Sequence, residues 1–562
     1  MGRIVDAYNS HLHYETPHFV RIASRLLLLA LALALCLPVF SVAASWLRWD
    51  AVSSQILLAM AQTVLPDYAL TSLQLCLVVG IGVAMVGGGA AAAVSLFEFP
   101  GRRIFEWALL LPLAVPAYVV AYAYTDFLQF SGPLQTSVRA MTGLEGRVFP
   151  EIRSLGGAAW VFVFALYPYV YVLTRTALAE RAAHLMEAAR MLGAPLGRRI
   201  RTVALPLSRP AIAAGVILAL METLADFGVS SYFGIQTFSA GIYKAWLAMD
   251  NSIAAAQLAT VLLLVVFALL KTEHWAQHRL RFSSSTAVGS QHTSDSQAVV
   301  LKGWQAAVAV ALCGIPVLAG FVLPMAFMLR PLVADWSVLP WDAFLRWSAN
   351  SLALGLGTAA LACTIALLLA FAVRTQQDRW TRGVVQIASL GYAVPGAVIV
   401  VGLLLPIGWL QARYPQTHIG YWMTATVLGL VWAYLVRFCG VALQTIQSGY
   451  ARVPTSLDDS ARMLGVTGAS LLRRVHLPLL HRSLAAAGLL VLVDVMKELP
   501  ATLVLRPFNS DTLAVVAYQL ARDERLGEAA LPSLALVLVG LIPVMLLNRT
   551  LRSSGAKPAP HK

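Results

Sequence analysis

Two pairs of acidic residues stand at equivalent positions in the two parts of this sequence. Glu222 and Asp226 are four residues apart, and Asp494 and Glu498 repeat this spacing 272 positions later. Residues four apart share one face of a helix, so each pair could present two carboxylates to the same site. Carboxylate oxygens are preferred ligands of hard cations, and four of them would give a path between the two parts a negative potential.

The composition predicts that these acids belong to a polytopic membrane protein. The chain is 59% hydrophobic and 12% charged, with a mean hydropathy of +0.73, which exceeds what the core of a soluble protein needs. The net charge is +14, but the basic residues cluster between apolar segments, as in cytoplasmic loops, so nucleic-acid binding is not expected. The five cysteines lie in apolar stretches without metal-ligand or disulfide spacing.

Twelve apolar segments are long enough to cross a hydrocarbon core of about 30 Å. They lie near residues 22–45, 70–96, 104–128, 157–178, 209–230, 253–271, 303–328, 350–373, 383–410, 421–446, 481–503 and 529–548. With the N-terminus inside, about 28 of the 41 Lys and Arg residues fall on cytoplasmic segments. This bias predicts twelve crossings with both termini in the cytoplasm.

The sequence is an internal duplication. Val115-Pro116 recurs as Val394-Pro395 at a shift of 279, and the acidic pairs recur at a shift of 272. We predict a first half at residues 1–276, a hydrophilic cytoplasmic linker at 277–302 and a second half at 303–562. Because each half has an even number of crossings, both have the same orientation, and a pathway would lie between them.

A charged side chain within an apolar span costs about 2.5–3.5 kcal/mol on insertion scales, so a functional role is the first hypothesis for these acids. Three other roles remain open: pairing with Lys497 or Arg437, capping of helix N-termini in a broken span, or a place in the outer loop. When the two halves are aligned in sequence, Lys497 is equivalent to Ala225, so the halves are chemically unequal. The candidates for lining a pathway are Glu222, Asp226, Asp494, Lys497 and Glu498, and no metal site is assigned.

Each half also contains a basic loop with the same motif. The first loop, near 184–206, contains Glu187, Ala188, Ala189, Gly193, Leu205 and Pro206. The second loop, near 456–478, contains Asp459, Ser460, Ala461, Gly465, Leu477 and Pro478 at the same spacing. Apolar and small residues at i, i+3, i+4 and i+7 predict a short amphipathic helix, a glycine turn and a new helix that begins near proline. Such a helix could lie on the membrane, but its repetition favours docking to a soluble partner.

Both loops resemble the coupling loops of ABC importer permeases, in which Glu-Ala-Ala precedes Gly and then Leu-Pro at this spacing. The second loop departs from that pattern at Asp459 and Ser460. The segments around the acids, 221–234 and 494–509, resemble those of the fused two-half permeases of ferric-iron importers. The resemblance implies an all-α type I permease fold with about twelve transmembrane helices in two homologous six-helix halves.

The resemblance also implies partners in a bacterial inner membrane: two copies of a cytoplasmic ABC ATPase, which receive the loop helices, and a periplasmic ferric-iron-binding protein. The chain has no GxxxxGK[ST] motif. ATP and Mg are therefore expected on the partner subunits, and this chain is expected to be a transport subunit without a cofactor rather than an enzyme. The predicted cargo is ferric iron. Alternatives are another small solute, such as thiamine, sulfate or a polyamine, or a stand-alone ion-coupled transporter, against which the docking loops argue.

Tyr232, Tyr243 and Trp246 follow the first acidic pair. A phenolate is a hard oxygen donor, so the two tyrosines could serve a ferric solute. We favour an aromatic belt at the membrane interface for all three.

Overall fold

The described part of this protein contains eleven to twelve candidate membrane crossings, where the sequence predicted about twelve. The computed structural model describes residues 18–47, 51–179, 183–282, 299–334, 336–337, 339–376 and 378–553. Among these residues, eleven helices are long and apolar enough to cross a membrane. A further pair, Arg102–Ala114 with Ala117–Thr142, is bent by 91° and supplies the twelfth crossing if it counts as one span.

Apart from two short strands, the described residues are almost all helical or in short connections. In the first half the elements are α2 (His18–Ala44), η1 (Ser45–Leu47), α3 (Ala51–Thr63), α4 (Leu65–Leu96), β1 (Phe97–Glu98), α5 (Arg102–Ala108), η2 (Leu111–Ala114), α6 (Ala117–Leu128), α7 (Pro133–Thr142), α8 (Leu155–Ala177), α9 (Ala183–Met191), α10 (Leu196–Arg199), η4 (Ile200–Ala204), α11 (Leu205–Ala225), α12 (Gly228–Phe233), α13 (Phe238–Tyr243), η5 (Lys244–Ala248) and α14 (Ser252–Phe282). Here η marks a 3-10 or π helix.

The second half repeats this order. Its elements are β2 (Val299–Val300), α15 (Trp304–Val317), η6 (Leu318–Val322), α16 (Leu323–Ala334), α17 (Trp341–Gln376), α18 (Arg379–Ala388), η7 (Ser389–Ala393), α19 (Gly396–Arg413), η8 (Pro415–Thr417), α20 (Ile419–Thr424), α21 (Val427–Tyr450), α22 (Thr455–Met463), α23 (Gly468–Leu471), η9 (Leu472–His476), α24 (Leu477–Lys497), α25 (Pro500–Leu505), α26 (Leu513–Arg522) and α27 (Leu526–Ser553).

Each half is built on three mutually packed helices, α4, α8 and α11 in the first and α17, α21 and α24 in the second. Glycines allow the close approach: a Cβ at Gly87 of α4 would lie 2.6 Å from the Tyr167 carbonyl oxygen of α8. A Cβ at Gly215 of α11 would lie 2.6 Å from the Val170 Cα atom. Lipid offers no hydrophobic drive for helices to associate, so close packing of this kind holds the bundle together.

The first helix of each half packs on the other half. α2 packs against α18 and α19, whereas α15 packs against α4, and α16 packs against α6 as well as against α27 of its own half. Ser41 in α2 donates a hydrogen bond to the carbonyl oxygen of Gly402 in α19. The structural units therefore exchange their first helices, although the boundaries predicted from the sequence assign each helix to its own half.

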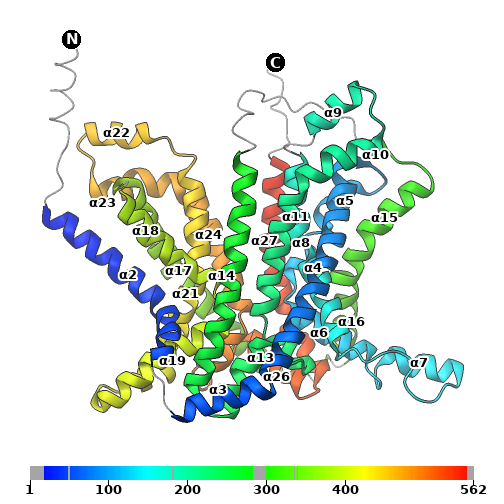
Figure 1. Ribbon diagram of the computed structural model, residues 1–562, viewed down its shortest axis with the longest axis horizontal. Coiled ribbons are helices and arrows are strands. Elements are labelled where there is room, and N and C mark those ends of the chain that lie inside the picture. Colours follow the sequence, from blue (N-terminus) through cyan, green and yellow to red (C-terminus); the bar gives the residue numbers. More distant parts are fainter. Residues whose placement is uncertain are drawn as a thin grey trace.

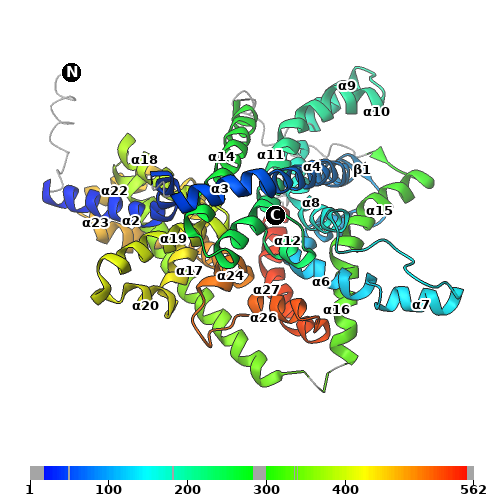
Figure 2. The same ribbon diagram turned by 60° about the horizontal axis from the view of Figure 1, so that its bottom comes forward.

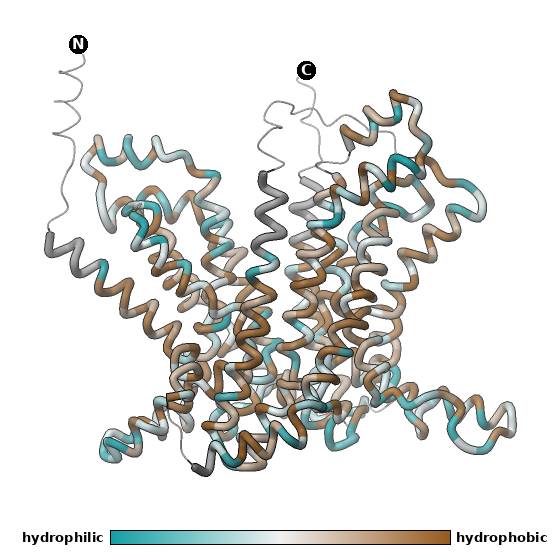
Figure 3. Tube along the Cα trace, in the orientation of Figure 1, coloured by the Kyte–Doolittle hydropathy of each residue, from teal (hydrophilic) through white to brown (hydrophobic). Residues whose placement is uncertain are grey.

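The two halves stand side by side with the same orientation (Figure 1). The helices α9 and α22 lie at one end of the molecule, and the long helices spread apart toward that end. The view from below in Figure 2 shows α7 and α20 projecting sideways at the opposite end. Apolar residues cover the middle of the helices and hydrophilic ones gather at both ends, as a bilayer requires (Figure 3).

Four predicted spans are interrupted rather than continuous. The spans near 104–128 and 383–410 break at Val115 and Val394, which are extended (φ −99°, ψ 120° and φ −80°, ψ 124°), because the proline that follows disfavours helical geometry in the preceding residue. The spans near 209–230 and 481–503 end at Ala225 and Lys497, and the short helices α12 and α25 follow. The repeated Val-Pro pair therefore marks a symmetric break.

The predicted linker is only partly covered by the described residues. Its first residues extend α14 to Phe282, and β2 at its end pairs in parallel with β1 of the first half. The remainder, 283–298, lies outside the described residues.

Candidate functional site

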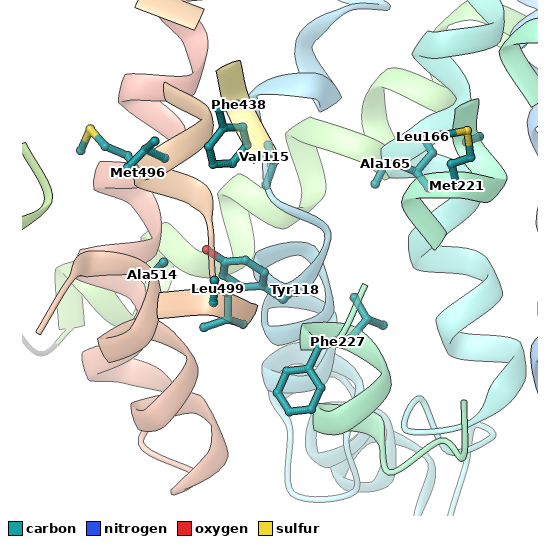
Figure 4. Close-up of a cluster of buried hydrophobic side chains, with 14 of the residues drawn as sticks. Val115, Tyr118, Ala165, Leu166, Met221, Phe227, Phe438, Met496, Leu499 and Ala514 are labelled. Atoms are coloured by element: carbon teal, nitrogen blue, oxygen red, sulfur yellow. The ribbon is translucent and has the colours of Figure 1, made fainter. Parts of the chain in front are cut away.

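A cavity of about 230 Å³ lies between the two halves and is lined by all five acidic and basic candidates of the sequence, namely Glu222, Asp226, Asp494, Lys497 and Glu498. Its other walls come from the broken segment before α6, from α8 and α11, and from η7, α21, α24 and α25. Figure 4 shows a cluster of buried hydrophobic side chains at this place, some of which line the cavity, with Tyr118 of the first half beside Leu499 of the second. The duplicated sequence thus converges on one site between the halves.

One acid of each pair caps the short helix that follows the break. Asp226 Oδ1 accepts a hydrogen bond from the Val229 amide nitrogen at 2.8 Å, at the start of α12. Glu498 Oε2 accepts from the amide nitrogens of Ala501 (3.0 Å) and Thr502 (3.1 Å), at the start of α25. The first amides of a helix lack partners within the helix, and a carboxylate there also interacts favourably with the helix dipole. Capping is one of the roles that the sequence left open.

Glu498 is also paired with a cation. Arg437 of α21 donates from Nη1 to Glu498 Oε1 at 2.9 Å, and the two side chains are 17% and 1% exposed. The residue equivalent to Arg437 in the first half is Ala165, which also lines the cavity. Both carboxylate oxygens of Glu498 are therefore bonded by protein donors, whereas Asp226 forms no ion pair within the described part of the chain.

The other acid of each pair, Glu222 or Asp494, lies one helical turn earlier and lines the cavity. Within the part of the chain that the structure describes, neither carboxylate is bonded to a protein donor. Tyr169 of α8 and Tyr392 of η7 line the cavity as well, and the sequence analysis missed both. The available signal was the position of Tyr392 two residues before the repeated Val-Pro pair. Two carboxylates without protein donors, in a polar lining, can offer oxygen ligands to a cation.

Lys497 joins the two halves at this cavity. It is the last residue of α24, and its Nζ atom donates to the carbonyl oxygen of Leu113 in η2 at 3.0 Å. Ala225, its equivalent in the first half, lines the same cavity.

The aromatic residues after the first acidic pair do not form an interfacial belt. Tyr243 is buried and its hydroxyl donates to the Pro500 carbonyl oxygen at 2.9 Å. Tyr232 is buried edge-on against Tyr122, with ring centroids 4.7 Å apart. Trp246 is half-buried. The belt prediction is therefore wrong for the two tyrosines, which pack between helices of the protein.

The two loop motifs form the same structure twice. The helices α9 and α22 are each followed by a glycine with positive φ, Gly193 and Gly465, both at 76°. A short helix and a π helix then lead into α11 or α24, which begins at Leu205-Pro206 or Leu477-Pro478. These geometries confirm the predicted helix, turn and restart.

The tips of these loop helices expose apolar side chains. Leu192 is 88% exposed and Leu464 is 82% exposed, and the adjacent Met191 and Met463 are also exposed. Most of the motif faces outward as well: Glu187, Ala188, Asp459 and Ser460 are exposed, Ala189 is half-buried and Ala461 is buried. Exposed apolar tips that occur twice at the same end of the molecule are typical of an interface with another protein.

The two loop helices are anchored differently on the bundle. In the first half, Leu178, Met186 and Ala204 form an apolar cluster beneath α9. The equivalent residues of the second half are Tyr450, Asp458 and His476. They are linked there by hydrogen bonds, with 3.0 Å between Tyr450 Oη and His476 Nδ1 and 3.0 Å between His476 Nε2 and Asp458 Oδ1.

Comparisons with known proteins agree with this architecture. The Fe(3+)-transport system permease protein FbpB 2 of Haemophilus influenzae is 24% identical over 93% of this chain and 97% of its own length. The probable ABC transporter permease protein y4fN of Sinorhizobium fredii is 23% identical over 85% of this chain and 86% of its own. A putative 2-aminoethylphosphonate transport system permease protein, PhnV of Salmonella typhimurium, is 26% identical over 42% of this chain and 84% of its own.

The family described as binding-protein-dependent transport system inner membrane component matches twice, at residues 80–272 and 362–553. Each match begins inside the first of the three packed helices of one half, α4 or α17. It continues through the other two helices and includes the loop helix and the acidic pair of that half. The chain therefore belongs to the family of binding-protein-dependent transport system inner membrane components, as an ABC-type permease with two family domains in one chain.

Proposed function

We propose that this permease moves ferric iron inward across the bacterial inner membrane. The observation that carries the proposal is the pair of carboxylates, Glu222 and Asp494, that line the cavity between the halves and have no donor among the residues that the structure describes. A relative over nearly the full length of both chains is named as an Fe(3+)-transport permease. Both facts favour a cationic cargo.

The charge of the cavity supports a cation over an anion. Four carboxylates and two basic side chains line it. Arg437 is engaged by Glu498, so the excess is negative where Glu222 and Asp494 lie. A hard trivalent cation loses water on entry, and carboxylate oxygens replace that hydration. The phosphonate named for one relative carries an anionic group that this lining would repel.

The exposed loop helices support an ATP-driven mechanism. We infer that α9 and α22 dock to two copies of a cytoplasmic ATPase, which binds ATP and Mg, and that both termini face the cytoplasm. The helix α22 continues through the short turn at Gly465 into α24, which carries Asp494. A movement imposed on the loop helix would thus reach the cavity through α24, as alternating access requires. A periplasmic binding protein would deliver the cargo at the opposite end.

Uptake of radiolabelled Fe(3+) into proteoliposomes tests the proposal, with the ATPase and binding protein present. Glu222→Gln with Asp494→Asn should abolish uptake while ATPase binding is kept. Glu145→Gln, in an exposed loop of the outer end, is the matched control and should transport normally. Glu187→Arg should lose both ATPase binding and uptake.

The outcomes separate the machine from its cargo. If wild-type uptake persists without the ATPase, the ABC mechanism is wrong. If ATP is hydrolysed and iron stays outside, or if the double variant transports iron normally, the cargo or the pathway is wrong. Competition by thiamine, sulfate or a polyamine would then identify the cargo.

A further inference from the structure

We propose that the ammonium group of Lys497 is the resident cation of this cavity, and that a cationic cargo takes its place beside Asp494 during transport. This inference rests on the proposed function, because it concerns the same cavity and assumes a cationic cargo. It assigns to Lys497 the role of setting how firmly the cargo is held.

The amine of Lys497 lies in a slot between the halves. Its Nζ atom is 3.0 Å from the Leu113 carbonyl oxygen, and Gly540 of α27 borders the side chain. A Cβ at Gly540 would lie 2.7 Å from Nζ and 2.8 Å from Cε. The Ala114 carbonyl oxygen would lie closer still, so the close approach of α27 to η2 already requires glycine at position 540, and the lysine side chain extends past this contact.

The fold itself does not require a lysine here. In the first half the equivalent of Lys497 is Ala225, and the equivalent of Leu113 in the second half is Tyr392. Both of these residues line the same cavity. Lys497 of the second half thus reaches across to a first-half carbonyl oxygen, whereas the first half has only a methyl group, that of Ala225, at the equivalent position. A charged group that only one half needs points to a role in binding.

The two basic residues of the cavity are held with different strength. Arg437 forms an ion pair with a buried carboxylate, whereas the bond from Lys497 Nζ goes to an uncharged carbonyl oxygen. Lysine also has a compact charge on a flexible four-carbon stem, so rotation of that stem can take the ammonium group away from the carbonyl oxygen. Lys497 is therefore the cation that an incoming cargo can displace.

Asp494 is the acid that the lysine and the cargo would share. It lies one turn before Lys497 on α24, at i and i+3, which places the two on one face of the helix. Both residues line the cavity. A multivalent cation at Asp494 and an ammonium group one helical turn away repel each other, so the lysine weakens binding of the cargo. With the lysine present, the cargo is released more easily.

Binding of Tb(3+) to the purified full-length permease tests this inference without the ATPase. Tb(3+) is a hard trivalent cation, and tyrosines close to it sensitise its luminescence; Tyr118, Tyr169 and Tyr392 line the cavity. Lys497→Met and Lys497→Gln should each bind Tb(3+) at least about tenfold more tightly than wild type, because both remove the positive charge. Lys497→Arg should remain within about threefold of wild type, because it keeps the charge.

The matched control is Lys244→Met, at an exposed lysine outside the cavity, and it should bind Tb(3+) as wild type does. Thermal unfolding of each variant verifies that it is folded. If Lys497→Met and Lys497→Gln bind Tb(3+) no more tightly while Asp494→Asn weakens binding, the inference is wrong and the cation pathway stands. If only Lys497→Met tightens binding, the role is structural and the inference is again wrong. If neither Asp494→Asn nor Glu222→Gln affects binding, the proposed cation pathway fails and the inference fails with it.

Discussion

His476 Nε2 lies 3.0 Å from Asp458 Oδ1 beneath the second loop helix, and both side chains are buried. Arg374 of α17 completes the site, with its Nε atom 2.7 Å from Asp458 Oδ2. At the same two positions the first half has Met186, on its loop helix, and Ala204, which belong to one apolar cluster. One loop helix is thus held by a charged network and the other by apolar contact, so the two respond differently to pH and to mutation.

Asp458→Asn should destabilise the permease by about 3–5 kcal/mol at pH 7, because it leaves Arg374 without its buried partner. Burial alone would raise the pKa of Asp458, but the hydrogen bonds from Arg374 and His476 outweigh it and hold this pKa below its usual value. A lowered pKa in the folded state stabilises the fold above the unfolded-state pKa of about 3.9. The difference between wild type and variant should therefore shrink only as the pH falls below about 4.

Chemical unfolding in detergent at several pH values measures this difference. The exposed neighbour Asp459 provides the matched control, because its pair with Arg462 is on the surface and Asp459→Asn should cost at most about 1 kcal/mol. Equal losses in the two variants would contradict a special role for the buried network.

The hydrogen-bonded network beneath the second loop helix should be replaceable by the apolar residues found beneath the first. Combining Tyr450→Leu, Asp458→Met, His476→Ala and Arg374→Ser reproduces the residues of the first half. We expect this variant to recover at least half of the stability lost in Asp458→Asn, since well-packed apolar residues often replace a buried ion network without loss. Unfolding midpoints of the two variants, compared at pH 7, give the answer. A combined variant less stable than Asp458→Asn would show that the surrounding second-half helices need the charges.

Leu192→Ser and Leu464→Ser should each weaken binding of the ATPase by at least about tenfold, because each removes an apolar side chain from the exposed tip of a loop helix. The permease itself should unfold at an unchanged temperature, as both side chains are solvent-exposed without the partner. Affinity for the purified ATPase subunit is the measurement. Leu144→Ser, which alters an exposed leucine at the opposite end, controls for general surface effects, and equal weakening by it would argue against docking at the tips.

Gly402→Val should loosen the packing of α2 on the second half. A Cβ at Gly402 would lie 2.7 Å from the Pro38 carbonyl carbon, so a branched side chain must push α2 away at a cost of about 1–3 kcal/mol. A thermal unfolding scan should show the loss, and a cysteine pair across α2 and α19 should crosslink less well. Gly408→Val, where nothing lies within 4 Å, should unfold like wild type. If it unfolds earlier as well, the effect belongs to α19 itself.

Arg437→Met should destabilise the protein because it leaves the carboxylate of Glu498 buried without its cation. The additional change Glu498→Gln should restore part of the loss, since the neutral side chain still accepts from the amides at the start of α25. A double-mutant cycle on unfolding free energies isolates the coupling between the two residues. Additive effects would mean that the ion pair contributes nothing to stability.

The sequence by itself determined the features that local chemistry and repetition decide. Apolar length fixed the number of crossings, the shift of 272 located both loop motifs, and Gly193 and Gly465 adopt the positive φ that their position required. Pro116 and Pro395 are a local signal for the breaks in two of the spans, which the apolar length of those segments did not reveal. These properties depend on a few consecutive residues and on the thickness of the bilayer.

Only the tertiary structure decided which groups meet across the chain. The two halves exchange their first helices, Arg437 pairs with Glu498 rather than with another acid, and Lys497 reaches a carbonyl of the opposite half. Identical spacing in the two acidic pairs could not show that Asp226 and Glu498 cap helices while Glu222 and Asp494 face the cavity. Such choices depend on distances between residues far apart in sequence, and those distances arise only when the helices pack.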